Sequence, residues 1–139
     1  MSELIVVDRD SAIQDLLASS YAAIYAYGVI AAHLTDPESA LDCMAIYRKK
    51  RDDLLAWCAE SGITPIAARA AYQLAGPTSD EASARVLGTL LEDRACAHWS
   101  QALYYLPAEL QTTEAAFLQT CAVRSFSWSG ITKPFFAAV

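Results

Sequence analysis

The sequence predicts an all-α protein, and more specifically a four-helix bundle. Apolar residues recur at helical spacing through most of the chain. Proline and glycine divide it into four long segments, and one extended link separates the second segment from the third; the dividing residues are Pro37, Gly62, Pro107 and Gly130. The 139 residues suffice for one hydrophobic core, so we expect a single domain over residues 1–139.

A first helix is predicted to begin at Ser11, whose hydroxyl can cap the backbone of Gln14 while Gln14 reaches back. It should end at Asp36, because the ring of Pro37 crowds the preceding residue out of the helical region. Pro37 then suits the first position of a second helix. So short a connection predicts that these two helices are antiparallel neighbours.

The stretch from Leu16 to Thr35 carries no formal charge and has the length of a membrane span. Serine, tyrosine and histidine interrupt it, and acidic rather than basic residues stand at both ends. A helix that neighbours cover on several sides can be equally apolar. We therefore expect a buried bundle helix and no membrane span.

The second helix should run from Pro37 to Ser61 and end where Gly62 adopts a left-handed conformation. The link from Gly62 to Thr78 could extend over about 50 Å, whereas a helix of this length measures roughly 38 Å. The link can thus cross the whole bundle. This predicts two antiparallel helix pairs joined by a long crossover.

The third helix should open at Thr78-x-x-Glu81, a capping-box pattern, and continue to about Leu106, where Pro107 prevents extension. A fourth helix is expected from Thr112 or Thr113 to Gly130. The apolar C-terminal tail, residues 131–139, is expected to pack across an end of the bundle.

Charge and motifs exclude several functions. A net charge of −6 and a pI near 4.7 argue against nucleic-acid binding. The N-terminus lacks the features of a signal peptide, which places the protein in the cytoplasm. The four cysteines stand singly, and no Glu-x-x-His motif occurs, so the sequence indicates no metal site and no cofactor.

A polar site is predicted at the middle of the bundle. Helical rotation places Arg48 and Asp52 on the apolar side of the second helix, at a spacing that lets them pair. Residues of the first and third helices take similar positions. The predicted site comprises Ser20, Tyr27, Arg48, Asp52, Arg94 and His98. It could bind a small anion or take part in acid-base chemistry, or it could be a structural ion-pair network that fixes helix register.

Four large residues, Tyr21, Tyr25, Ile46 and Trp57, lie off the inward sides of the first two helices. We expect either the tail or a second subunit to cover them, which favours a homodimer through these helices. The alternative is that they are ordinary exposed aromatics.

Four segments resemble one known family: Tyr21–Val29, Tyr47–Asp52, Ala71–Leu74 and Arg124–Trp128. Together they are similar to a bacterial family of ferritin-like domains of unknown function. This resemblance implies the ferritin-like form of the four-helix bundle over nearly the whole chain.

The chain departs from that family at its metal-binding positions. Members often carry Glu-His before the Ala-rich stretch of the first helix and His at the start of the basic run. Ser20-Tyr21 and Tyr47 stand there instead. Neither serine nor tyrosine replaces a bridging carboxylate or a neutral imidazole, so the resemblance brings no metal site with it.

The leading interpretation is a non-catalytic interaction or small-ligand-binding module that lacks the usual di-metal ligands. The alternative is a ferritin-like di-metal oxidoreductase or metal-binding protein with irregular ligands drawn from Asp52, Glu92, His98 and Glu114. A third class is a partner of membranes or membrane proteins that uses the uncharged first helix.

Overall fold

The computed structural model describes residues 4–130. Four α-helices account for most of them, namely α1 (Arg9–Ala32), α2 (Glu38–Ser61), α3 (Glu81–Leu103) and α4 (Ala108–Ser129). No strand occurs among residues 4–130. The predicted all-α class and the four helices are therefore confirmed, whereas the packing predicted for the tail lies outside the described residues.

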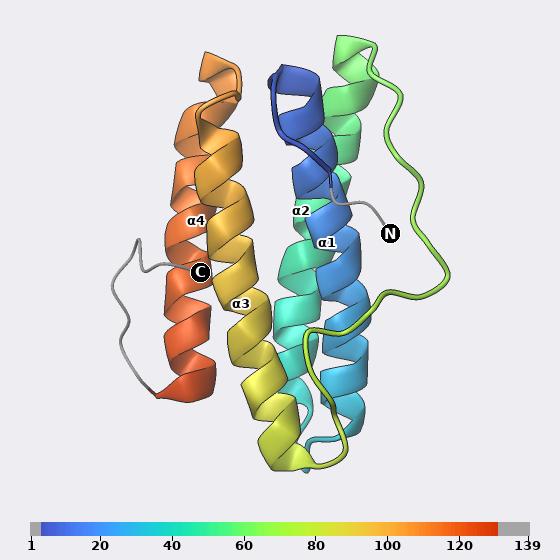
Figure 1. The fold of residues 1–139 in the computed structure, drawn as a ribbon, viewed down its shortest axis with the longest axis vertical. Coiled ribbons are helices and arrows are strands. Elements are labelled where there is room, and N and C mark those ends of the chain that lie inside the picture. The colour runs from blue at the N-terminus through green and yellow to red at the C-terminus, as the bar shows by residue number, and fades with distance from the viewer. Residues whose placement is uncertain (1–3, 131–139) are drawn as a thin grey trace.

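The helices lie side by side along one long axis (Figure 1). Helix α1 packs against α2 and α3, and α3 packs against α4. The segment between α2 and α3 runs down the length of α1, so α2 and α3 point in the same direction (Figure 1). Within each pair, α1 with α2 and α3 with α4, the helices are antiparallel.

The first and third helices begin differently from the prediction. Asp8 and Asp80 are the N-caps, and their carboxylates accept from the backbone N–H groups of Ser11 and Ser83 at 2.8 Å. The caps predicted at Ser11 and Thr78 were therefore wrong. A carboxylate close to the positive helix end is a stronger acceptor than a hydroxyl, so each aspartate takes the cap and its serine completes the box.

The two residues predicted to complete those caps hold connecting segments instead. The Gln14 side chain donates to the Thr64 carbonyl and accepts from the Ile66 N–H, both at 2.9 Å. Glu81 Oε1 accepts from the Thr35 N–H at 2.7 Å. These bonds attach the long link to α1 and the α1–α2 turn to α3, which fixes the connections against the bundle.

Glycine ends α2 and α4 as predicted, since Gly62 and Gly130 both have φ of 72°. The start predicted for the last helix was wrong, because α4 begins at Ala108 rather than near Thr112. Pro107 occupies the N-cap position, where a missing N–H has no consequence for the helix. The proline thus separates α3 from α4 by only four residues.

Part of the surface expected to need a second subunit is covered within the chain. The Tyr25 ring lies 6.0 Å from that of Tyr72 in the long link, and the Arg9 guanidinium lies over the Trp57 ring. Ile46 remains 40% exposed. The homodimer through α1 and α2 stays a prediction.

Helix α1 is long and apolar enough to cross a membrane by length and composition. A core helix can meet the same criterion, and Leu16, Leu17 and Ile30 of α1 are completely buried against its neighbours. The absence of a membrane span stays a prediction.

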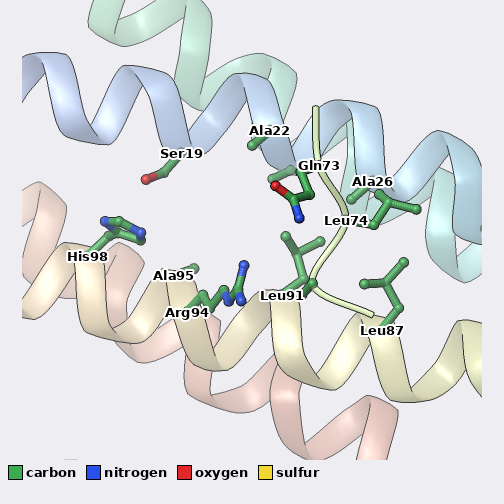
Figure 2. A pocket seen from close by; sticks show the side chains of 12 residues that line it. Ser19, Ala22, Ala26, Gln73, Leu74, Leu87, Leu91, Arg94, Ala95 and His98 are labelled. Atoms are coloured by element: carbon green, nitrogen blue, oxygen red, sulfur yellow. The ribbon is translucent and has the colours of Figure 1, made fainter. Parts of the chain in front are cut away.

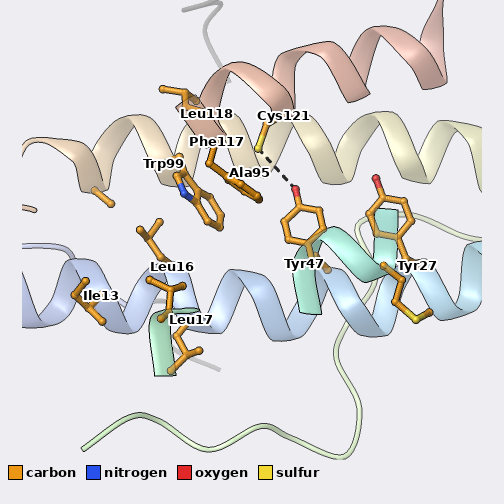
Figure 3. Close-up of a cluster of buried hydrophobic side chains, with 14 of the residues drawn as sticks. Ile13, Leu16, Leu17, Tyr27, Tyr47, Ala95, Trp99, Phe117, Leu118 and Cys121 are labelled. Atoms are coloured by element: carbon orange, nitrogen blue, oxygen red, sulfur yellow. Dashed lines mark hydrogen bonds between the residues drawn. The ribbon is translucent and has the colours of Figure 1, made fainter. Parts of the chain in front are cut away.

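Small residues line the space between α1 and α3, whereas larger side chains fill the core toward α2 and α4. Ala23 and Ala95 face the α1–α3 contact and are almost fully buried. Tyr47 of α2, Trp99 of α3 and Phe117 of α4 form an aromatic group in the core (Figure 3). Two buried carboxylates lie beside this aromatic group, since Tyr47 donates to Glu92 and Trp99 donates to Glu114.

Candidate functional site

A fully buried carboxylate, Glu92 of α3, lies at the centre of a polar cluster. It accepts hydrogen bonds from the Tyr27 hydroxyl, from the Tyr47 hydroxyl at 2.7 Å and from Arg124 Nε at 3.1 Å. These donors come from α1, α2 and α4. One carboxylate therefore joins all four helices.

The direction of the hydrogen bonds makes Glu92 the acceptor. Trp128 Nε1 donates to the Tyr27 oxygen at 3.1 Å, and an indole N–H can only donate. The Tyr27 hydroxyl therefore donates its own hydrogen bond to Glu92. Arg124 Nη2 approaches the Tyr47 oxygen at 3.5 Å, which leaves that hydroxyl to donate in the same way. Burial raises the pKa of the Glu92 carboxyl above its usual value, although Arg124 and the two tyrosine hydroxyls oppose this rise. Within the ion pair with Arg124, the ionised carboxylate is the form that these three donors stabilise.

Arg124 supplies the balancing positive charge. Burial alone would lower the pKa of its guanidinium, but the Glu92 carboxylate together with Tyr47 and Cys121 raises it by more, so the pKa lies above its usual value. Its remaining N–H groups approach Thr120 Oγ1 at 2.9 Å and Cys121 Sγ at 3.3 Å. The cation also lies over the Phe117 ring, 5.1 Å from its centre.

The phenols and the thiol of this cluster are held neutral. Burial, and then the negative charge of Glu92, raises the pKa of Tyr27 and that of Tyr47. The same two causes raise the pKa of the Cys121 thiol. None of these three groups is therefore an available base or nucleophile near neutral pH.

A second buried ion pair links α2 to α4. Lys50 Nζ lies 2.8 Å from Glu114 Oε2, and the two side chains are 7% and 3% exposed. Trp99 Nε1 donates to the other oxygen of Glu114 at 2.9 Å. Sequence reasoning missed this pair because Lys50 belongs to a basic run. The signal for it was the position of Lys50 three residues after Tyr47 and four before Leu54, on one helix face.

The predicted inward placement of Arg48 and Asp52 was wrong, since both are exposed. The inward side of α2 passes through Tyr47, Leu54 and Cys58, about one residue's rotation from the predicted side. Asp52 pairs with its neighbour rather than with Arg48, as Arg51 Nε lies 2.9 Å from its carboxylate.

The other four predicted site residues divide between two places. Tyr27 belongs to the Glu92 cluster, and Ser20 is buried with its hydroxyl donating to the Leu16 carbonyl at 2.8 Å. Arg94 and His98 line a separate pocket. That the six residues form a single binding site stays a prediction, and the structure does not bring them together.

The irregular ligands of the di-metal alternative do not converge. Both oxygens of Glu92 are bonded to donors, Glu114 is bonded to Lys50 and Trp99, and Asp52 is exposed. Within residues 4–130, no group of three or more histidine, cysteine, aspartate or glutamate residues could hold a metal ion.

The pocket has a volume of about 110 Å³ and lies between α1, α3 and residues 73–75 of the long link. Figure 2 shows the Arg94 and Gln73 side chains directed into it, with Ser19 and His98 toward one end. Its walls are apolar and include Ala22, Ala26, Leu74, Leu87, Leu91 and Ala95. The pocket thus combines an apolar floor with polar groups at its mouth.

His98 is oriented by a buried carboxylate. Its Nδ1 lies 2.8 Å from Asp15 Oδ2, and the Asp15 side chain is 6% exposed. This contact favours a proton on Nδ1 and leaves Nε2 available to another partner. Ser19 makes no hydrogen bond to His98 among the described residues. Ser19, His98 and Asp15 therefore do not form the hydrogen-bonded chain of a catalytic triad.

Comparison with known proteins gives a structural relative of unknown function. The chain is similar to a conserved hypothetical protein from Mycobacterium tuberculosis, rv2844, whose crystal structure it matches with a TM-score of 0.82 and 27% sequence identity. The match covers 86% of this chain and 93% of that one. No curated protein matches the chain. A family model matches residues 12–137, and the chain therefore belongs to the family described as Domain of unknown function (DUF4439).

Proposed function

We propose that this protein is a non-catalytic, ferritin-like four-helix bundle that serves as a small-ligand-binding or interaction module. The observation that carries the proposal is the ion pair between Glu92 and Arg124 at the centre of the bundle. The order of the helices supports the ferritin-like description, because two antiparallel pairs are joined by a link that runs along the bundle (Figure 1).

A ferritin-like bundle implies a pair of metal ions held by inward carboxylates and histidines. The residues here do not fit that group. Glu92 has both oxygens bonded to tyrosine and arginine donors, and the guanidinium of Arg124 already neutralises it. A metal ion bound to Glu92 would displace the Arg124 guanidinium. That buried cation would then lack its counter-charge, which costs several kcal/mol. The interior favours its own fixed cation over a metal.

The chemistry of the cluster also supports a non-catalytic protein. Glu92 and Tyr47 are completely buried, so no substrate can reach them without opening the core. Tyr27 and Cys121 have raised pKa values and hold their protons. The cluster is therefore suited to holding four helices in register rather than to transferring protons.

Metal analysis tests this proposal. The full chain, purified without chelators from cells supplied with iron, manganese and zinc, should carry substantially less than one metal per chain. Adding Fe(II) in air should produce no new absorbance band beyond that of a blank. The control is Glu92→Gln, which removes the central charge at nearly constant shape. About two metals per chain, reduced in Glu92→Gln, would overturn the proposal.

A further inference from the structure

The pocket between α1 and α3 has both apolar and polar lining residues, and none of them belongs to the Glu92 cluster. Its floor is formed by almost fully buried residues, among them Ala23, Leu87 and Ala95. Arg94 and Gln73 stand at its mouth and are exposed to solvent. A ligand could therefore place an apolar body on the floor and a polar group at the mouth.

Arg94 determines which polar group that would be. It makes no hydrogen bond or ion pair with any described residue, although the protein has a net charge of −6. Its guanidinium and the Gln73 amide both point into the pocket (Figure 2). A guanidinium presents parallel N–H donors that match the two oxygens of a carboxylate. The mouth of the pocket thus favours a carboxylate.

A carboxylate beside the pocket is hydrogen-bonded to His98, which lines it. Asp15 is buried, and its carboxylate is turned to His98 Nδ1. His98 can then offer Nε2 to the ligand, as an acceptor when neutral or as a donor when protonated. The arrangement orients the ligand's carboxylate toward Arg94 and away from Asp15.

The size of the pocket limits the ligand. An apolar cavity of about 150 Å³ holds a benzene molecule, and this pocket measures about 110 Å³ and opens to solvent. Resting on the proposed ligand-binding function, we propose that the pocket binds a small organic monocarboxylate with an apolar body of about four to six carbon atoms. Alanine side chains on α1 and α3 leave the room that this body occupies.

Calorimetric titration of the full chain tests the proposal with defined probes. Benzoate and 3-methylbutanoate are compared with benzamide and 3-methylbutanamide, which have the same shapes without the charge, and with inorganic phosphate. Both carboxylates should bind at millimolar concentration or better, and both amides at least about tenfold more weakly, because a charge-assisted hydrogen bond is lost. Phosphate should not compete with them.

Two variants locate the binding. Arg94→Gln should weaken carboxylate binding about tenfold, whereas Arg48→Gln, at an exposed arginine of α2 outside the pocket, should leave it unchanged. Ala22→Leu should abolish binding by filling the pocket from its wall, with circular dichroism as the check on folding. Absence of carboxylate binding, equal binding of amides, or equal effects of the two arginine changes would overturn the proposal.

This test can fail separately from the metal analysis. A chain that lacks metal and does not bind carboxylates would refute the pocket ligand and leave the proposed non-catalytic module intact. A chain with two metals in the core would refute the proposed function whatever the pocket binds.

Discussion

Arg124 Nε of α4 lies 3.1 Å from Glu92 Oε2 of α3, and the two side chains are 10% and 0% exposed. The pair is removed from solvent and surrounded by aromatic rings, so neither charge can be compensated by water. Each partner therefore depends on the other for its stability in the core.

Breaking this pair should be strongly destabilising. Glu92→Gln leaves the Arg124 cation buried without its counter-charge, and Arg124→Met leaves the Glu92 anion in the same position. We expect each change to lower the free energy of unfolding by about 3 to 5 kcal/mol. Urea unfolding followed by circular dichroism measures it.

The double variant Glu92→Gln with Arg124→Met provides the control for that pair. Because it removes both charges together, its loss should be clearly smaller than the sum of the two single losses. Additive losses would show that the two side chains act independently and that the pair is not the source of the effect.

Adjacent lysines on α2 allow a matched comparison of a buried and a surface ion pair. Lys50 pairs with Glu114 in the core, while Lys49 pairs with Asp53 at 3.0 Å with side chains 78% and 56% exposed. Lys50→Met should cost about 3 to 5 kcal/mol in thermal or urea unfolding, because Glu114 is left unpaired. Lys49→Met should change stability by less than about 1 kcal/mol. Similar losses in both variants would contradict the assigned burial.

The four helices could be predicted because their signals are local. Gly62 and Gly130 act on backbone dihedral angles within one or two residues, and they end helices as expected. The predictions at Pro37 were wrong in detail, because α1 ends at Ala32 rather than Asp36, and Pro37 is the N-cap of α2 rather than its first residue. The failures at the N-caps are also local. Asp8 and Asp80 each lie three residues before a serine, so each begins its own capping box at a different residue from the one predicted.

The polar core could not be predicted, because its members depend on contacts between helices. The predicted inward side of α2 was rotated by about one residue from the observed side. Arg48 and Asp52 were therefore predicted to face the core, whereas Lys50 is the charged residue that does. Glu92 and Arg124 lie 32 residues apart in sequence and are joined only when α3 packs on α4. Of the six residues predicted to form the site, Tyr27 is the one that belongs to this cluster.

Alkaline pH should destabilise the protein through its buried tyrosines. Burial and the Glu92 charge raise the pKa of Tyr47 in the folded state, whereas in the unfolded chain it is near 10. The stabilising contribution is therefore complete below about pH 9 and is lost as the pH rises above about 10. Tyr47→Phe removes one such group, so its stability should fall less steeply with pH, by up to about 1.4 kcal/mol per pH unit.

Urea unfolding of the parent and Tyr47→Phe at several pH values between about 9 and 11 (about one pH unit on each side of the ordinary tyrosine pKa) checks this expectation. The comparison depends on slopes, so the stability lost with the hydroxyl itself does not affect it. Parallel slopes would mean that Tyr47 ionises as easily in the folded protein as in the unfolded chain.

The cysteine thiols should react slowly in the folded protein. Burial raises the pKa of Cys43 and Cys58, and it raises the pKa of Cys96 to about 11. Since the thiolate is the reacting form, Cys96 should react with a disulfide reagent at pH 8 about a hundredfold more slowly than in the unfolded chain. Time courses with and without urea measure the ratio. Equal rates in both conditions would contradict the burial of the thiols.

Two glycines within helices, Gly88 and Gly28, differ in how much space they leave for a Cβ atom. A Cβ on Gly88 would lie 2.8 Å from Cδ2 of the Trp128 ring, whereas a Cβ on Gly28 would meet Met44 Cε at 3.5 Å, an ordinary contact distance. The indole of Trp128 also donates to Tyr27, so it cannot move without disturbing the Glu92 cluster. Gly88 therefore sets how closely α3 approaches α4.

Gly88→Ala should consequently destabilise the protein by about 1 to 3 kcal/mol, because overpacking against a rigid ring outweighs the better helix propensity of alanine. Gly28→Ala should be neutral or stabilising by up to about 1 kcal/mol, since only the propensity changes. Urea unfolding gives both values, and the near-ultraviolet circular dichroism of tryptophan should change in Gly88→Ala alone. If Gly88→Ala is as stable as Gly28→Ala, the α3–α4 contact is looser than the structure describes, and the indole is not required to hold Tyr27 against Glu92.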